Sequence, residues 1–217
     1  MPFSDPVVTP DLWAWQERFP ALSLEAFGLR WADDVAALDA APVLLGYSLG
    51  GRLGLQALAA RPSLWRGAIF VSTHPGLVSA EEREARRAHD AVWARRAREE
   101  SWDAFLADWN AQPVLAHQAV PASQPALEPR REAIAGGFES WSLGCQLPME
   151  GVLARSACPI WWVVGERDAP YRALARRVAG AAPAVRVVVV PGAGHRLLWE
   201  RPEALAEIAA EALGQMG

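Results

Sequence analysis

A serine in a glycine-containing turn is the first residue whose surroundings could do chemistry. Ser48 stands in Gly46–Gly50, whose letters GYSLG fit the pattern G-x-S-x-G, between an apolar run at 42–46 and Ala/Leu-rich sequence at about 49–60. Between a strand and a helix, such a turn lifts the serine hydroxyl clear of the sheet, and glycines leave room for it. The helix then begins beside the hydroxyl, so the backbone N–H of Leu49 is predicted to be an oxyanion donor.

A histidine and a carboxylate complete the set that a reactive serine requires. A serine hydroxyl becomes reactive when a histidine accepts its proton and a carboxylate orients that histidine. His195 ends the loop PGAGH, and Asp168 ends the loop GERD, each directly after a strand-like run. The chain order Ser, Asp, His and these positions predict a catalytic triad of Ser48, Asp168 and His195. Glu166 is an alternative to Asp168, and helix capping by Asp168 is the competing, purely structural interpretation.

Short apolar runs alternate with helical segments along most of the chain. This alternation predicts an α/β fold with a mainly parallel sheet and right-handed crossovers. We expect neighbouring strands, in this order, at 42–46, 68–71, 159–164 and 185–190. The predicted helices lie at about 22–40, 49–60, 171–180 and 202–213. The carboxyl ends of parallel strands meet at one edge of a sheet, where binding sites form, so the three triad residues are expected to converge there.

The middle of the chain, about 77–157, breaks the alternation. It opens with the capping-box pattern of Ser79 and Glu82 and continues into Glu/Arg-rich helical sequence with recurring tryptophans. We interpret it as a helical insertion that caps Ser48 within one domain, 1–217. The tryptophans are expected mainly to pack helix against helix.

Composition excludes several function classes. The 217 residues carry a net charge of −4 and no lysine, so no basic surface for nucleic acid is expected. The only two cysteines, Cys145 and Cys158, fit no metal-binding spacing and are predicted to be free thiols. No leader-like start and no membrane-length apolar run is present, so a soluble, cytoplasmic protein without membrane contact is expected. We predict no metal, no cofactor, and a monomer or homodimer.

From about residue 42 onward the chain resembles one branch of the α/β-hydrolase superfamily, the 2-succinyl-6-hydroxy-2,4-cyclohexadiene-1-carboxylate (SHCHC) synthases of menaquinone biosynthesis. The segments that carry the resemblance have the sequences GYSLGGR, THPGL, ADWNAQPV, GERD with YRALA, and GAGH; they lie at 46–52, 73–77, 107–114, 165–168 with 171–175, and 192–195. The resemblance implies the α/β-hydrolase fold and a lyase that eliminates pyruvate from a cyclohexene ring bearing several carboxylates.

The same resemblance implies a small-molecule anionic substrate, held by arginines that clamp its carboxylates. The matching substrate-contact positions are Arg52, Arg86, Trp109 and one of Arg130 and Arg131. Arg52 lies one helical turn after Ser48, which by itself favours a position facing the site. Tyr47 is expected to place its ring or hydroxyl near the substrate.

The front of the chain departs from the family pattern. The family opens with about forty more residues, among them a strand ending in His-Gly whose following loop completes the oxyanion hole, and no His-Gly precedes Ser48 here. The fold class is therefore an α/β-hydrolase fold shortened at its N-terminus. Because an unpaired strand edge in a core is costly, we expect Val7–Thr9 to pair with the strand at 42–46. That pairing would bring Asp11, Leu12 or Trp13 to the oxyanion position.

Three functions remain open from the sequence. The first is the SHCHC synthase-type lyase, and the second is a carboxylesterase or thioesterase with Ser48 as a true nucleophile. The third is a catalytically weakened member that serves as a binding protein. The arginines favour the lyase, the intact triad favours an enzyme, and the absent His-Gly loop favours the weakened member.

Overall fold

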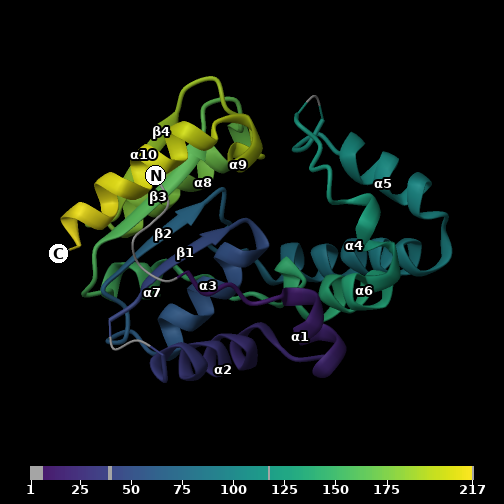
Figure 1. The fold of residues 1–217 in the computed structure, drawn as a ribbon, viewed down its shortest axis with the longest axis horizontal. Helices are drawn as coiled ribbons and strands as arrows, with labels where there is room; N and C mark the ends of the chain where they lie inside the picture. The colour runs from purple at the N-terminus through teal and green to yellow at the C-terminus, as the bar shows by residue number, and fades with distance from the viewer. Residues whose placement is uncertain (1–6, 39–40, 117, 217) are drawn as a thin grey trace.

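The computed structural model describes residues 7–38, 41–116 and 118–216. A four-stranded sheet forms its centre, in which all neighbouring strands are parallel. The strands are β1 (Val43–Tyr47), β2 (Gly67–Val71), β3 (Ile160–Gly165) and β4 (Arg186–Val190), adjacent in the order β1-β2-β3-β4. The predicted strand order and the parallel α/β fold class are thus confirmed (Figure 1).

Helices cover both faces of the sheet. One face packs against α2 (Leu24–Ala36), α3 (Leu49–Ala60), α7 (Glu150–Arg155) and α8 (Ala169–Ala181). The other face packs against α9 (Leu197–Glu200) and α10 (Pro202–Gln215). Successive strand residues point to opposite faces, so Phe70 and Trp162 enter the first core, whereas Val71 and Val163 enter the second.

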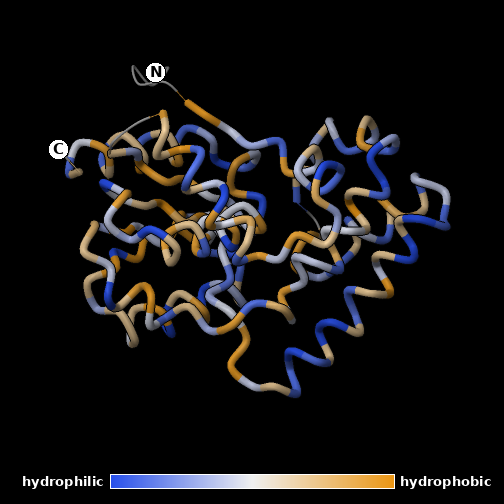
Figure 2. The backbone as a smooth tube through the Cα atoms, turned by 90° about the horizontal axis from the view of Figure 1, so that it is seen from below, coloured by the Kyte–Doolittle hydropathy of each residue, from blue (hydrophilic) through white to orange (hydrophobic). Residues whose placement is uncertain are grey.

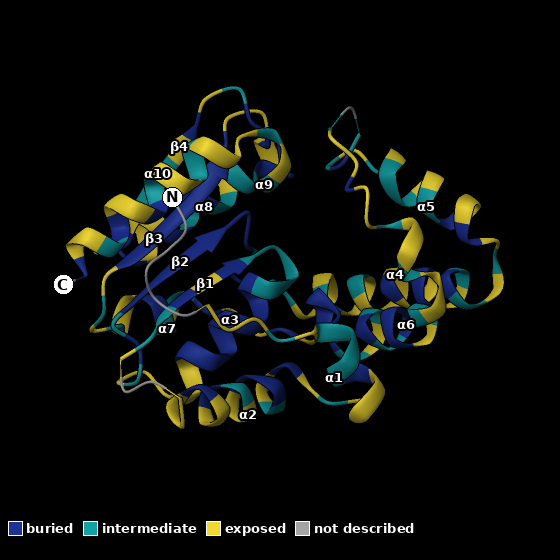
Figure 3. Cartoon of the chain, viewed as in Figure 1, coloured by how far each residue is buried: buried dark blue, intermediate teal, exposed yellow. Residues whose placement is uncertain are grey.

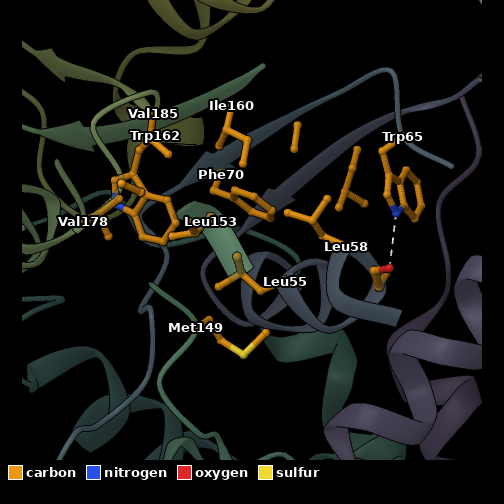
Figure 4. Packing of buried hydrophobic residues seen from close by; sticks show 14 of the residues in the cluster. Leu55, Leu58, Trp65, Phe70, Met149, Leu153, Ile160, Trp162, Val178 and Val185 are labelled. Atoms are coloured by element: carbon orange, nitrogen blue, oxygen red, sulfur yellow. Dashed lines mark hydrogen bonds between the residues drawn. The ribbon is translucent and has the colours of Figure 1, made fainter. Parts of the chain in front are cut away.

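The larger core lies between the sheet and the helices α2, α3, α7 and α8, and Figure 4 shows it from close by. Leu55, Phe70 and Trp162 are fully buried in it. Trp65 closes one end of this core and donates its indole N–H to the carbonyl of Ala57 at 3.2 Å. Burying each such side chain contributes about 1.5–3 kcal/mol, and this core fixes the strands whose ends carry the site.

The segment between β2 and β3 is mainly helical, as predicted. Its helices are α4 (Ala80–Glu99), α5 (Trp102–Ala111), α6 (Arg131–Ser140) and the short 3₁₀ turns η1 (Pro125–Arg130) and η2 (Leu143–Cys145). Together we call these five elements the cap. Figure 2 shows it as a second mass beside the sheet and its helices. Helix α7 lies within the predicted insertion, yet its Leu153 is buried in the sheet core, so the cap ends before α7.

Hydrogen bonds and aromatic contacts explain the cap's helices. The Ser79 hydroxyl accepts from the Glu82 N–H, and the Glu82 carboxylate accepts from the Ser79 N–H, which forms the expected capping box. Trp93 lies edge-on to Phe105 at 5.9 Å, and Trp102 stacks on Phe105 at 4.8 Å, measured between ring centroids. The cap therefore has an aromatic core of its own, separate from the sheet cores.

The prediction that Val7–Thr9 forms a strand beside β1 is wrong. These residues form no strand, and Val7 and Val8 are 68% and 51% exposed. Among the described residues, no strand pairs with the outer edge of β1. Leu45 on that strand is 47% exposed, and Figure 3 shows β2 buried throughout while β1 is only partly so.

The N-terminal segment instead joins the cap through helix α1 (Leu12–Arg18). Its Trp13 contacts Gly137 of α6, and its Gln16 donates to the Ser140 hydroxyl at 2.7 Å. The apolar side chains of α1 enter a cluster with Phe27 and Trp141. Burial of two tryptophans and a leucine outweighs the few backbone hydrogen bonds that a three-residue strand would add.

Both Cys145 and Cys158 are free thiols, as predicted. In the part of the chain that the structure describes, no helix is long and apolar enough to cross a membrane. The same residues contain no group of three or more His, Cys, Asp or Glu side chains that could hold a metal ion.

Candidate active site

The turn that carries Ser48 joins the end of β1 to the start of α3. Ser48 has φ 49° and ψ −112°, a strained conformation for a residue with a side chain. A Cβ on Gly46 would lie 2.6 Å from Gly51 Cα, so the strand and helix approach each other too closely for side chains there. A Cβ on Gly50 would meet nothing within 4 Å, so the steric requirement falls on Gly46 and Gly51 rather than on Gly50.

The three predicted triad residues come together at the carboxyl edge of the sheet. Ser48 Oγ lies 3.2 Å from His195 Nε2, and His195 Nδ1 lies 2.8 Å from Asp168 Oδ2. A carboxylate accepts only, so the Nδ1–H of His195 donates to Asp168 and its Nε2 is left to accept the serine proton. Asp168 and His195 are both 4% exposed, which protects their hydrogen bond from competing water.

Glu166, the alternative to Asp168, has a different position. Its carboxylate accepts the backbone N–H of Gly192 at 2.8 Å and thereby joins the loop after β3 to the loop after β4. This contact leaves Asp168 as the residue that orients His195. The hydrogen bond of Glu166 stabilises the loop on which His195 lies.

Two aromatic rings flank the imidazole of His195. Tyr171, in the first turn of α8, lies 4.4 Å from His195 between ring centroids, and Tyr47, at the end of β1, lies 5.8 Å away. Burial raises the pKa of both phenols, so they remain neutral. Tyr47 was predicted to lie at the site. Tyr171 was not assigned a role, although its place three residues after Asp168 on a helix start was a usable signal.

His74 is a second histidine beside the triad, and sequence reasoning gave it no role. It follows β2, and its ring meets Tyr171 edge-on at 6.2 Å between centroids. The N–H of Gly76 donates to its Nδ1 at 3.0 Å, so the proton of the neutral ring lies on Nε2. Burial, with smaller contributions from Arg52, Arg177 and Arg86, lowers the pKa of His74 to about 3.

Arg52 is a buried cation one helical turn after Ser48. It is 9% exposed, its Nε donates to Gln146 Oε1 at 2.8 Å, and its Nη2 donates to the carbonyl of Trp141. Both acceptors are neutral. Burial, and then the charge of Arg86, lower the pKa of Arg52 to about 10.

Arg86 reaches the same region from the first half of α4. Its Nε donates to Asp90 Oδ1 at 2.8 Å, and its side chain remains 38% exposed. Asp90 is itself buried and accepts the Ser142 hydroxyl at 2.8 Å, so it holds Arg86 at the inner side of the cap. The electrostatic effect of Arg86 on Arg52 and His74 places the three groups near one another.

The remaining arginine candidates from the sequence have their contacts within the cap or with helix α1. Arg130 forms ion pairs with Asp11 at 2.7 Å and Glu17 at 3.0 Å, and so fastens α1 to the cap. Arg131 donates to the carbonyl of Glu100 at 2.7 Å and lies over the ring of Trp102. The structure therefore does not bring Arg130 or Arg131 to Ser48, because carboxylates and carbonyls of neighbouring elements bind them first.

Trp109 lies in the aromatic core of the cap. Its ring is 5.2 Å from both Trp93 and Phe138, measured between centroids. It is only partly buried. The cap core thus fixes its place.

The predicted oxyanion donor begins helix α3 beside Ser48, whereas the predicted source of a second donor has another partner. Leu49 is the first residue of α3, where a backbone N–H has no partner within the helix. The N–H of Trp13, by contrast, donates to the Asp11 carboxylate at 3.1 Å as the cap of α1. The prediction that the segment after Pro10 supplies the second donor depended on a strand at Val7–Thr9 beside β1. That strand does not form, so this prediction is wrong as well.

Comparison with known proteins gives the family. Residues 3–208 match the model of the alpha/beta hydrolase family. The SHCHC synthase of Klebsiella pneumoniae subsp. pneumoniae is 32% identical over 216 residues, which cover 90% of this chain and 84% of that protein. The SHCHC synthase of Escherichia coli O1:K1 is 34% identical over 163 residues, which cover 73% of this chain and 63% of that protein.

Solved structures share the fold at lower identity. MenH from S. aureus superposes with a TM-score of 0.81 at 19% identity, covering 98% of this chain and 79% of that one. A thermophilic esterase from Thermogutta terrifontis has a TM-score of 0.66 at 24% identity, covering 89% and 73%. With this fold, and with identity to the Klebsiella protein over most of both chains, the chain is an enzyme of the α/β-hydrolase superfamily and belongs to its 2-succinyl-6-hydroxy-2,4-cyclohexadiene-1-carboxylate synthase family.

Proposed function

We propose that this enzyme is a carbon–oxygen lyase of menaquinone biosynthesis that eliminates pyruvate from a polycarboxylated cyclohexene intermediate. The observation that carries the proposal is the guanidinium of Arg52. It lies one helical turn after Ser48 and is buried, and within the described part of the chain its hydrogen bonds go to the neutral oxygens of Gln146 and Trp141. A buried cation without a carboxylate partner is costly to the free enzyme, and an anionic substrate would offset that cost.

The charges around Arg52 support the same substrate class. Arg86 and the neutral His74 lie nearby and add hydrogen-bond donors. The carboxylate of Asp90 acts on Arg52 more weakly than Arg86 does, and it already accepts hydrogen bonds from Arg86 and Ser142. Charged groups in a partly buried site interact strongly, so two guanidinium groups can hold a substrate with several carboxylates. An apolar ester would gain nothing from this arrangement.

In the proposed reaction the triad acts as a base. Ser48 Oγ takes a proton from a ring carbon while its own proton passes to His195 Nε2, and Asp168 stabilises the resulting imidazolium. The electron pair of the broken C–H bond forms a ring double bond. The bond between the ring and the leaving oxygen breaks, and the leaving group departs as the enolate of pyruvate, which takes up one proton to become pyruvate while His195 returns to its neutral form. The backbone N–H of Leu49 stabilises negative charge that develops beside Ser48.

Ester or thioester hydrolysis is the second candidate. The distance of 3.2 Å between Ser48 Oγ and His195 Nε2 suits a serine nucleophile equally well. In that reaction Ser48 forms an acyl-enzyme that water hydrolyses, and the arginines near the site have no necessary part. A non-catalytic binding role would leave the hydrogen-bonded triad without a use.

The test is a direct comparison of two substrates on the purified protein and its Ser48→Ala variant. Pyruvate release from the cyclohexene intermediate is followed beside hydrolysis of a p-nitrophenyl ester. We expect the intermediate to be turned over with a kcat/KM at least a hundredfold above that of the ester, and Ser48→Ala to abolish both activities. If the protein hydrolyses the ester but releases no pyruvate, the second candidate replaces the lyase assignment. If the protein shows neither of the two activities, a binding role is favoured.

A further inference from the structure

The turn at 74–76, just after β2, is held by hydrogen bonds from other parts of the fold. Each of its three carbonyl oxygens accepts one: that of His74 from Gln146 Nε2 at 3.0 Å, that of Pro75 from the N–H of Met149 at 2.7 Å, and that of Gly76 from Arg177 Nη2 at 2.6 Å. Gly76 has φ 109°, and a Cβ on it would lie 2.4 Å from the carbonyl oxygen of Leu147, so only glycine fits there. The backbone of His74 is therefore fixed independently of any ligand.

The same turn fixes which ring nitrogen of His74 carries the proton. The N–H of Gly76 donates to Nδ1 at 3.0 Å, so Nδ1 is the acceptor and Nε2 carries the hydrogen. Burial, and the charges of Arg52, Arg177 and Arg86, hold the pKa of the ring at about 3, so it is neutral at pH 7. The turn thus presents His74 Nε2–H as an uncharged hydrogen-bond donor.

Gln146 connects this turn to the buried cation of the site. Its amide nitrogen donates to the carbonyl of His74, and its amide oxygen accepts from Arg52 Nε at 2.8 Å. Gln146 is fully buried, so its amide keeps this orientation. Of the three charges that act on His74, that of Arg52 has the largest effect, which places the guanidinium close to the imidazole.

Two donors in this corner have no partner among the described residues. Arg52 uses Nε and Nη2 on Gln146 and Trp141, which leaves Nη1, and His74 uses Nδ1, which leaves Nε2–H. Neither atom is among the fully buried polar atoms that lack a hydrogen bond, so both are open to a ligand.

Tyr171 places these two donors beside the triad. Its ring lies 6.2 Å from the ring of His74 and 4.4 Å from that of His195, measured between centroids. Arg52 lies one helical turn after Ser48 on α3. A ligand group bound by the two donors is therefore bound in the same site as the serine and the catalytic histidine.

The carboxylates around these donors are bound by other groups. Glu150 pairs with Arg177 at 2.6 Å, Asp90 accepts from Arg86 at 2.8 Å, and Asp168 accepts from His195 at 2.8 Å. The two oxygens of a ligand carboxylate can accept from a guanidinium and an imidazole together. A neutral imidazole adds its hydrogen bond without the repulsion that another cation beside Arg52 would cause.

We propose that the Nε2–H of His74 and the Nη1 of Arg52 form a subsite that binds one carboxylate of the anionic substrate. His74 is the neutral member of this subsite, and the turn at 74–76 keeps its proton on Nε2. The inference rests on the proposed function for the class of substrate and does not depend on the elimination step. It adds a substrate-binding residue that the sequence analysis did not assign.

Binding of cyclohex-1-ene-1,2-dicarboxylate, a stable ring with two carboxylates, tests the subsite by isothermal titration calorimetry. Two variants of His74 separate its two nitrogens. In His74→Asn, the amide oxygen can replace Nδ1 as the acceptor for the Gly76 N–H, but no donor remains at the place of Nε2. In His74→Gln, the amide nitrogen reaches that place and donates. His89→Asn replaces an exposed histidine of α4 and is the matched control.

We expect His74→Asn to raise the Kd of the dicarboxylate by about ten- to a hundredfold, because one hydrogen bond to a charged group is lost. His74→Gln should recover most of the affinity, and His89→Asn should match wild type. For the polycarboxylated intermediate, His74→Asn should raise KM by a similar factor and change kcat by less than about threefold. The double variant with Arg52→Ala should lose less affinity than the two single losses combined, because both residues bind one carboxylate.

The melting temperature and the p-nitrophenyl ester activity of each variant check that the fold and the triad are intact. If His74→Asn binds the dicarboxylate as tightly as wild type, or if His74→Gln binds it as weakly as His74→Asn, the inference is overturned. Should the variants fail to fold, NMR of the ring nitrogens of wild type decides. The Nε2–H signal of His74 should move when the dicarboxylate saturates the site, and an unchanged signal would contradict the subsite.

The same measurements separate this inference from the proposed function. If the protein binds the dicarboxylate through His74 but releases no pyruvate from the intermediate, the subsite stands and the lyase assignment fails. If His74→Asn releases pyruvate with the wild-type KM, the lyase assignment stands and the subsite fails.

Discussion

His195 Nδ1 lies 2.8 Å from Asp168 Oδ2, with both side chains almost fully buried, whereas Glu166, two residues before Asp168, bonds the backbone of Gly192. The two carboxylates share one loop and have different tasks. Asp168 fixes the tautomer of the histidine, and Glu166 joins the two loops that carry the triad members. This division gives a matched pair of variants for the triad.

We expect Asp168→Asn to lower kcat by about 10³–10⁴-fold, because an amide in place of the carboxylate favours the wrong tautomer of His195. Glu166→Gln should keep kcat within about threefold, since an amide oxygen still accepts from Gly192. Steady-state kinetics on the better of the two substrates measures both. A larger loss in Glu166→Gln than in Asp168→Asn would contradict this assignment and would mean that Glu166 orients His195.

Arg52 and Arg130 were both candidates in the sequence, with the stronger case for Arg52, and they differ in the structure. Arg52→Ala should lower kcat/KM for the polycarboxylated substrate by about ten- to a hundredfold, corresponding to about 1.5–3 kcal/mol of charge-assisted contact, and leave ester hydrolysis nearly unchanged. Arg130→Ala should leave both activities unchanged and make the segment with α1 more sensitive to protease, because its ion pairs with Asp11 and Glu17 hold that helix. Equal losses of lyase activity in the two variants would contradict this placement.

The depressed pKa of His74 predicts a pH-dependent stability. The pKa is about 6.5 in the unfolded chain and about 3 in the folded protein, so between pH 6.5 and 3 the unfolded state binds a proton that the folded state does not. The stability of the folded protein that depends on a neutral His74 is therefore fully present above pH 6.5 and is lost as the pH falls toward 3. We expect His74→Asn to remove about 1–3 kcal/mol of the loss in unfolding free energy between pH 7 and 4.

Urea unfolding at both pH values, followed by tryptophan fluorescence, measures that difference. His89→Asn serves as the control, because it replaces an exposed histidine of α4. An identical pH dependence in wild type and His74→Asn would show that His74 takes up a proton readily in the folded protein. The charged groups that act on His74 are Arg52, Arg86 and Arg177, all of which oppose protonation.

Two adjacent leucines test the bare edge of β1. Leu44 is 6% exposed and faces the core with α3, whereas Leu45 is 47% exposed on the opposite face. Leu44→Ala should lower the free energy of unfolding by about 2–5 kcal/mol, and Leu45→Ala by less than about 1 kcal/mol. Chemical denaturation of the two variants at one pH suffices. A cost at Leu45 approaching that at Leu44 would mean that another segment or another molecule covers this strand in solution.

The sequence by itself determined the sheet, its order, most helix ranges and the three triad positions. Those features depend on local patterns: apolar runs of strand length, Gly-rich turns at their ends, and the topological rule that parallel strands end at one edge of the sheet. Gly46, Ser48 and Gly51 behave as the turn requires, and Ser79 and Glu82 cap their helix as their spacing predicted. Each inference needed only residues close together in the chain, or the direction of the strands.

Only the tertiary structure decided what distant partners each side chain would find. Val7–Thr9 has a strand's composition but forms no strand, because Trp13 and Trp15 bury more apolar surface against α6, Phe27 and Trp141 than pairing with β1 would. Arg130 and Arg131 form ion pairs and hydrogen bonds with acceptors on neighbouring elements rather than with the site. Conversely, Arg196 and Asn110, 86 residues apart, meet because the cap folds back onto the loop of His195. Contacts of this range depend on how whole layers pack, and no local pattern in the sequence encodes them.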